Sequence, residues 1–187
     1  MNKTLLIVDL QNDFISGSLA IPDAPSIIPI INILLRAFPY SIATKDWHPP
    51  EHCSFKKWPI HCLQNTKGSR FPKEFDISYI SLIVFKGSEV NSDSYSGFID
   101  NDSKNETVLD SFLREKKTEQ LYICGLATDY CVKATALDAV KRNFNTFIIQ
   151  DACRGVSPQT TSEALKEMED NGVKLTDSKK IIKSVLG

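Results

Sequence analysis

Short apolar runs recur along the chain, and the segments between them carry the signals of turns and helices. Six runs of four or five residues are rich in apolar and β-branched side chains, and such runs are typical of strands buried on both faces. The predicted strands are residues 5–8, 40–44, 81–85, 120–124, 146–149 and 173–176. Their alternation with helices predicts one α/β domain over residues 1–187, with three layers in the order α/β/α and a mostly parallel six-stranded sheet.

Helices are expected between these strands, and several of them begin at a residue that commonly caps a helix. The residues expected at these starts are Ser26, Thr107, Thr128, Ser157 and Asp177. The helix from Ser26 is expected to reach Phe38, and the one from Ser157 is expected to end at Gly172. Glycine favours that position because it adopts the left-handed conformation at a helix end without steric cost.

Polar and reactive side chains stand where the predicted strands end. Asp9, Asp46 and Lys86 each follow or end a strand, and Cys131 lies in the first turn of the helix after residues 120–124. Taken alone, these residues are ordinary: a loop-capping aspartate, an exposed lysine or a small buried thiol. Because the carboxyl ends of parallel strands meet at one sheet edge, where α/β proteins bind ligands, their convergence predicts a single site.

Cys131 has the position expected of a nucleophile. The backbone N–H groups and the positive end of the dipole at a helix start favour a thiolate over a thiol. The same N–H groups can hold an oxyanion. A small buried cysteine remains the alternative when position alone is considered.

A second cluster follows residues 40–44. Asp46 and His48 are two residues apart, so they can point to the same side of an extended backbone, and His61 follows nearby. Nitrogen and oxygen ligands of this kind suit a metal ion, and three protein ligands leave positions open for catalysis. From spacing alone, a polar surface loop is an equally good interpretation.

The composition and charge of the chain indicate which kinds of molecule it can bind. The formal net charge is −1 and there is no basic run, which argues against nucleic acid and anionic membranes. We expect a small-molecule substrate. The composition does not decide whether the chain forms a homo-oligomer. Five cysteines without regular spacing, the absence of a recognisable leader and the lack of a long apolar run predict a cytoplasmic protein without disulfides or membrane spans.

Five segments together resemble the motifs of nicotinamidases in the isochorismatase-like cysteine hydrolase superfamily. They occur in the family's order and span almost the whole chain. The segments are 9–14 (DLQNDF), 45–50 (KDWHPP), 58–62 (WPIHC), Lys86 with 93–98 (DSYSGF), and 125–132 (GLATDYCV). The second and third segments, with their aspartate and histidines, single out the nicotinamidases, since many other superfamily members lack them.

The resemblance implies a catalytic triad of Asp9, Lys86 and Cys131. Cys131 would attack the amide carbon of nicotinamide to give a thioester, with Asp9 moving the proton and Lys86 stabilising the charges. The N–H groups of Ala127 and Cys131 would form the oxyanion hole. In the family, the peptide bond before the first of these, here Leu126–Ala127, is cis.

The resemblance also implies one divalent metal ion, with zinc favoured over iron or manganese. The implied ligands are Asp46, His48 and His61, and His52 is a candidate fourth ligand. The metal would bind the ring nitrogen of the substrate. The residues expected to line the substrate pocket are Phe14, Trp58, Tyr95 and Leu126.

Two other functions compete with this one. A hydrolase of the same superfamily could act on isochorismate or on a carbamoyl or ureido compound, but such members generally lack the metal segment. A non-catalytic metal-binding or partner-binding protein on the same fold is the second alternative. The intact set of Asp9, Lys86 and Cys131 argues against it.

Overall fold

We describe residues 2–186 of the chain in a computed structural model. The core is one six-stranded sheet with the order β3-β2-β1-β4-β5-β6. Every pairing in it is parallel, whereas the sequence predicted only a mostly parallel sheet. The strands are β1 (Lys3–Val8), β2 (Tyr40–Asp46), β3 (Leu82–Lys86), β4 (Gln120–Leu126), β5 (Asn145–Arg154) and β6 (Lys174–Thr176).

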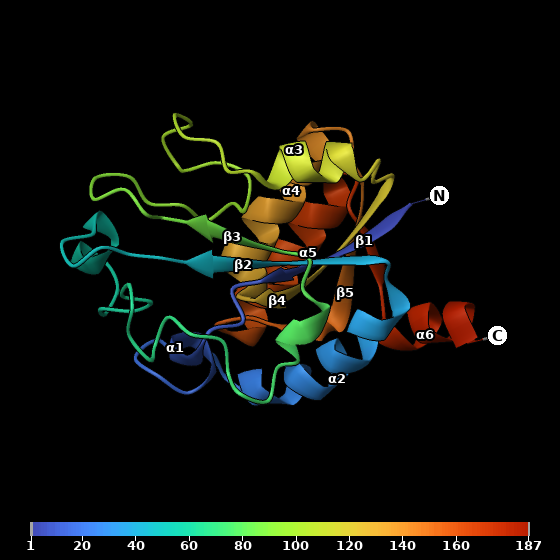
Figure 1. The fold of residues 1–187 in the computed structure, drawn as a ribbon, viewed down its shortest axis with the longest axis horizontal. Coiled ribbons are helices and arrows are strands. Elements are labelled where there is room, and N and C mark those ends of the chain that lie inside the picture. The colour runs from blue at the N-terminus through green and yellow to red at the C-terminus, as the bar shows by residue number, and fades with distance from the viewer. Residues whose placement is uncertain (1, 187) are drawn as a thin grey trace.

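Helices cover both faces of the sheet, so the predicted layer order is confirmed. Figure 1 shows α3 and α4 on one side of the strands and α2 and α6 on the other. The helices are α1 (Asn12–Ile15), α2 (Ile27–Leu34), α3 (Leu109–Glu115), α4 (Lys133–Lys141), α5 (Pro158–Asp170) and α6 (Ser178–Leu186). Among the described residues, no helix is both long and apolar enough to cross a membrane.

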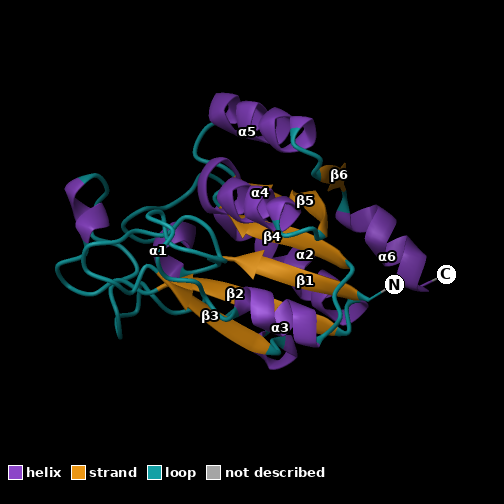
Figure 2. Ribbon diagram, turned by 90° about the horizontal axis from the view of Figure 1, so that it is seen from above, coloured by secondary structure: helices purple, strands orange, loops and turns teal. Residues whose placement is uncertain are grey.

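The central strand β1 explains why the sheet must be covered on both sides. Its residues 5–8 are fully buried, and burial of such apolar side chains is the main driving force for this layered packing. Figure 2 shows the strands pointing together toward one end of the molecule, where the loops gather. This end carries the predicted site.

Some helix starts follow the sequence prediction. The Ser157 hydroxyl accepts a hydrogen bond from the N–H of Thr160 at 3.2 Å, and Asp177 accepts one from the N–H of Lys180 at 2.9 Å. Gly172 follows α5 with φ +89°, as expected of a residue that ends a helix. The start of α3 lies one residue later than predicted: Val108 is its N-cap residue, and the preceding Thr107 hydroxyl accepts from the N–H of Leu109.

Other helix ends differ from the prediction. Ser26 does not cap α2, because it ends the 3₁₀ turn η1 (Ala24–Ser26) with a helical backbone, and its hydroxyl lies within hydrogen-bond distance of the Asp23 carbonyl and carboxylate. The α-helix ends at Leu34, a 3₁₀ turn η2 (Leu35–Ala37) follows, and Phe38 is extended, as the residue before a proline tends to be. Thr128 does not cap its helix either, which opens with the π-turn η5 (Thr128–Val132).

Candidate active site

Asp9, Lys86 and Cys131 meet at the carboxyl edge of the sheet. The buried Lys86 ammonium lies 3.0 Å from Asp9 Oδ2 and donates to Cys131 Sγ at 3.6 Å. The carboxylates of Asp9 and Asp46 and the Cys131 sulfur lie within 4.8 Å of one another. The sequence therefore predicted correctly that residues from four strand ends converge.

The packing of β1 on β4 sets the distance between Asp9 and the segment that carries Cys131. Gly125 pairs with Val8, and its φ of +116° is a conformation that favours glycine. A Cβ atom at Gly125 would lie 2.2 Å from the Val8 carbonyl oxygen, so a side chain there would force the strands apart. The peptide bond Leu126–Ala127 is cis, as the resemblance implied.

Asp9 is held in an environment that suits a proton acceptor. Its backbone has φ +47°, its N–H donates to the Thr44 hydroxyl, and that hydroxyl in turn donates to Asp9 Oδ1 at 2.6 Å. Burial raises the pKa of Asp9 above its ordinary value, although the Lys86 charge opposes the shift. A carboxylate with a raised pKa is a better base than an exposed one.

Lys86 is charged although its side chain is fully buried. Burial alone would lower its pKa, but the carboxylates of Asp46 and Asp9 raise the pKa well above the ordinary value. The ammonium also donates to the Ser94 carbonyl oxygen at 2.8 Å and to Asp46 Oδ1. Lys86 thus contacts both the predicted triad and the predicted metal ligands.

The buried surroundings of Cys131 oppose the thiolate that its position at a helix start favours. Burial raises the pKa of this thiol well above its ordinary value, and the nearby Lys86 charge only partly compensates. Desolvation therefore acts against the helix-start effect. A thiol with a raised pKa needs a base close to it, and the Asp9 carboxylate lies within 4.8 Å of the sulfur.

Asp46, His48 and His61 form a buried group whose ligand atoms lie within 4.8 Å of one another. The His48 Nδ1–H bonds to the Gly87 carbonyl at 2.8 Å, and the His61 Nδ1–H bonds to the Pro59 carbonyl at 2.7 Å. Both rings then offer Nε2 as a ligand, an arrangement typical of metal-binding histidines.

Two observations show that a cation fits this group. His48 Nε2 is buried without a hydrogen-bond partner among the described residues, and it lies 3.6 Å from Asp46 Oδ2. Burial opposes protonation of His48, yet the Asp46 carboxylate raises its pKa, so the site favours positive charge. Burial lowers the pKa of His61, which keeps that ring neutral, as a ligand must be.

His52 lies beside this group with both ring nitrogens engaged. Nδ1 lies 2.6 Å from the Ser54 hydroxyl, Nε2 lies 3.2 Å from the Ser92 carbonyl oxygen, and the ring stacks on His48 at 3.9 Å. Its ligand atoms group with His48 and Asp93 rather than with Asp46 and His61. The role of His52 as a fourth ligand stays a prediction.

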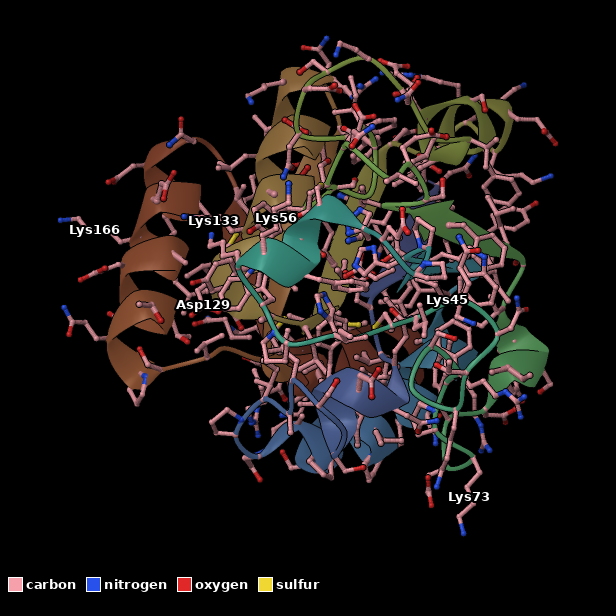
Figure 3. All side chains as sticks on the ribbon, turned by 90° about the vertical axis from the view of Figure 1, so that its left-hand side faces the viewer. Lys45, Lys56, Lys73, Asp129, Lys133 and Lys166 are labelled. Atoms are coloured by element: carbon pink, nitrogen blue, oxygen red, sulfur yellow. The ribbon has the colours of Figure 1, made fainter. Side chains whose placement is uncertain are left out.

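One cavity adjoins both clusters, since Cys131, Asp46 and His61 all line it. Three of the predicted pocket residues, Phe14, Trp58 and Tyr95, also lie in its wall. Leu126 is fully buried in the core, and the next residue, Ala127, lines the cavity, so the role of Leu126 in substrate binding stays a prediction. Figure 3 looks onto this loop-covered end, with the turn η3 (Cys53–Lys56), which carries Lys56, in front.

Comparison with known proteins agrees with this geometry. The isochorismatase domain pattern matches residues 3–180 of the chain. The chain belongs to the isochorismatase family.

The chain is similar to nicotinamidases and pyrazinamidases. The nicotinamidase of Escherichia coli is 37% identical, over 92% of this chain and 93% of its own length. The pyrazinamidase of Pyrococcus horikoshii, solved in complex with zinc, is 38% identical with a TM-score of 0.83 and covers 95% and 99% of the two chains. The yeast nicotinamidase bound to the inhibitor nicotinaldehyde is 31% identical with a TM-score of 0.90, over 94% and 99%.

Sequence reasoning missed several residues that line the pocket of this isochorismatase-family chain, Tyr130 and Val156 among them. Tyr130 lines the cavity and contacts the Trp58 ring edge to face at 5.3 Å between centroids. Val156 lines it from the loop after β5, where its N–H donates to the Asp129 carboxylate. Both residues follow strand ends on the site edge, which is the signal that could have identified them.

Proposed function

We propose that this protein is a metal-dependent nicotinamidase, which hydrolyses nicotinamide to nicotinate and ammonia in NAD salvage. The observation that carries the proposal is the single cavity that joins the Cys131 thiol, backed by Asp9 and Lys86, to the candidate metal ligands Asp46 and His61. The names of the similar proteins support the same substrate. An amide and an aromatic ring nitrogen are the two groups that such a cavity would recognise.

Acylation begins when Asp9 takes the proton of the Cys131 thiol. The sulfur attacks the carboxamide carbon, and the N–H groups of Ala127 and Cys131 stabilise the oxyanion of the tetrahedral intermediate. The carbon–nitrogen bond then breaks, and Asp9 returns the proton to the leaving nitrogen as ammonia departs. A thioester between the nicotinoyl group and Cys131 remains.

Deacylation uses the same groups in reverse. Asp9, again a carboxylate, accepts a proton from water, and the resulting hydroxide attacks the thioester carbon. The carbon–sulfur bond breaks, and the proton returns to the Cys131 sulfur as nicotinate is released. The Lys86 ammonium offsets the negative charge that moves between Asp9 and the sulfur, 3.0 and 3.6 Å away.

Asp46, His48 and His61 would hold the metal ion, and the zinc complex of the Pyrococcus relative supports zinc. A divalent ion held there would supply a Lewis acid for the pyridine nitrogen and would so help to select and orient the ring. Phe14, Trp58 and Tyr95 would pack around that ring.

The test is hydrolysis of nicotinamide by the purified protein, followed as nicotinate and ammonia. Activity should be lost after removal of metal with a chelator and should return when zinc, iron or manganese is added. Cleavage of isochorismate, or of a carbamoyl or ureido compound, without cleavage of nicotinamide would overturn the proposal in favour of another hydrolase. The absence of any turnover in metal-loaded protein would favour a binding protein.

A further inference from the structure

The turn after β1, residues 9–13, runs into α1 and contributes three side chains to the site edge, at alternate positions. Asp9 faces Lys86, whereas the next two, Gln11 and Asp13, contact neither Lys86 nor the Cys131 sulfur by any hydrogen bond among the described residues. Instead, Gln11 bonds to the backbone of the candidate metal ligand Asp46. Asp13 accepts from the backbone N–H of the residue that follows the candidate ligand His61. Both side chains lie far from those ligands in sequence, so the contacts exist only in the fold.

Gln11 holds the backbone of Asp46 from both sides. Its Nε2 donates to the Asp46 carbonyl oxygen at 2.8 Å, and its Oε1 accepts from the Asp46 N–H at 2.8 Å. The same Nε2 donates to the Ser69 carbonyl oxygen at 3.1 Å, and the side chain is fully buried. The β1–β2 pairing ends at Ile7 and Ala43. Beyond that point, the Gln11 side-chain amide makes the hydrogen bonds to Asp46 that a continued β1 strand would otherwise make.

Asp13 holds the residue that follows His61. Its Oδ2 accepts from the Cys62 N–H at 2.8 Å, and Cys62 has the uncommon φ of +47°. A Cβ atom at Gly68 would lie 2.0 Å from the same Oδ2, so the loop packs directly on this carboxylate. The Asp13 carboxylate therefore stabilises the turn from which the His61 ring projects.

We propose that Gln11 and Asp13 are positioning residues that preorganise the metal centre, Gln11 by fixing Asp46 and Asp13 by fixing His61. The inference rests on the metal-dependent function proposed above. A ligand that is already held in place loses little conformational entropy when the ion binds, and groups that orient ligands typically contribute about 10–100-fold to metal affinity. The chain would thus use one short turn both to supply the base Asp9 and to build the metal site.

Asn12 provides a matched control within the same turn. Its Nδ2 donates to the Lys67 carbonyl oxygen at 2.8 Å, so it also ties the turn to the loop before Ser69. Within the described part of the chain, the Asn12 side chain makes no hydrogen bond to the backbone of a candidate ligand or of its neighbours. A general loosening of the turn should appear in Asn12→Ala as well, whereas a loss of ligand positioning should not.

The experiment measures zinc affinity of the full-length protein without substrate, by competition with a chromophoric chelator. Gln11→Met, which keeps the side-chain length, and Asp13→Ala should each bind zinc about 10–100-fold more weakly, while Asn12→Ala should bind like the wild type. Asp13→Asn retains an oxygen that can accept from Cys62 and should restore most of the affinity. Absorption of the cobalt-substituted proteins should shift in the two weakened variants, because their ligand geometry changes.

Urea unfolding of the metal-free variants shows the conditions under which each variant is folded. Zinc affinities are compared only under those conditions, so that a loss of affinity reflects ligand positioning and not unfolding. Unchanged zinc affinity and an unchanged cobalt spectrum in folded Gln11→Met and Asp13→Ala would overturn the inference. An equal loss in Asn12→Ala would overturn it too. Failure of the wild type to hydrolyse nicotinamide would instead overturn the proposed function, because these measurements use no substrate.

Discussion

Lys86 and Asp46 are paired neighbours on adjacent parallel strands, and they form a buried ion pair across β3 and β2. The same ammonium lies 3.0 Å from Asp9, while the other oxygen of Asp46 lies 3.6 Å from His48 Nε2. Asp46 therefore lies between two positive partners, the lysine of the proposed triad and the proposed metal ion. The proposed nucleophile and the candidate metal ligands share one electrostatic network.

This network predicts that Lys86→Met binds a divalent metal more tightly while losing turnover. Removal of the ammonium frees an Asp46 oxygen and removes a repelling charge a few ångströms away, which should increase affinity by at least about tenfold. The metal-free variant should be less stable by about 3–5 kcal/mol, because two buried carboxylates lose their partner. Added zinc should then raise its Tm more than that of the wild type.

Lys45→Met is the control for this prediction. Lys45 is the residue before Asp46, is nearly buried, and lies 4.8 Å from the centre of the Trp47 ring. It forms no ion pair with Asp46 among the described residues. A smaller zinc-induced rise in Tm for Lys86→Met than for the wild type would contradict the shared network.

Cys131→Ala should reduce kcat by on the order of 10⁴-fold or more, because the nucleophile is lost while the pocket remains. The protein should stay folded, since the change removes one sulfur atom at a helix start. Cys124→Ala is the matched variant: Cys124 is fully buried in β4 and does not line the cavity, so activity should persist. Steady-state ammonia release checks both, and substantial turnover by Cys131→Ala would assign the nucleophile elsewhere.

The anchoring role proposed for the metal predicts selection by the ring nitrogen. Benzamide, which lacks this nitrogen, should be cleaved with a kcat/KM lower than that of nicotinamide by as much as roughly 10⁴-fold. His61→Ala should damage the reaction of nicotinamide far more than that of benzamide. Competition between the two amides for the metal-loaded protein measures the ratio, and similar rates for both would limit the metal to a structural or water-activating role.

A pH effect on stability is expected from the surface contact between Asp23 and Arg154. The Arg154 Nε donates to Asp23 at 2.9 Å, and this bond, with one from Ser26, lowers the pKa of Asp23. A depressed folded-state pKa gives stability that is present above the unfolded pKa of about 3.9 and is lost as the pH falls through the folded value.

Asp23→Asn should therefore lower the urea midpoint at neutral pH, and its difference from the wild type should shrink as the pH falls from about 5 to about 3. Asparagine also tolerates the left-handed φ of +57° at this position, so backbone strain does not obscure the comparison. A gap that stays constant over this pH range would show that the charge of Asp23 does not contribute to stability.

Much of the fold followed from local sequence signals. The six strands were predictable because each is a short run rich in apolar or β-branched residues, although only the central strands are buried on both faces, since β3 exposes Ile83 and Phe85. Pro158 and Gly172 mark the ends of α5 through their own backbone preferences. Asp9, Asp46, Lys86 and Cys131 could be assigned to one edge, because parallel strands direct their carboxyl ends the same way.

Other features were decided by contacts between segments far apart in the chain. The Ser26 hydroxyl does not cap α2 and accepts a hydrogen bond from the distant Arg154 at 2.8 Å. Leu126 is buried in the core, while Tyr130 and Val156 line the cavity. The raised pKa of Cys131 likewise depends on how deeply the assembled protein buries the sulfur. Sequence patterns report propensity and periodicity, which are local, whereas burial and side-chain partners arise only when the strands pack together.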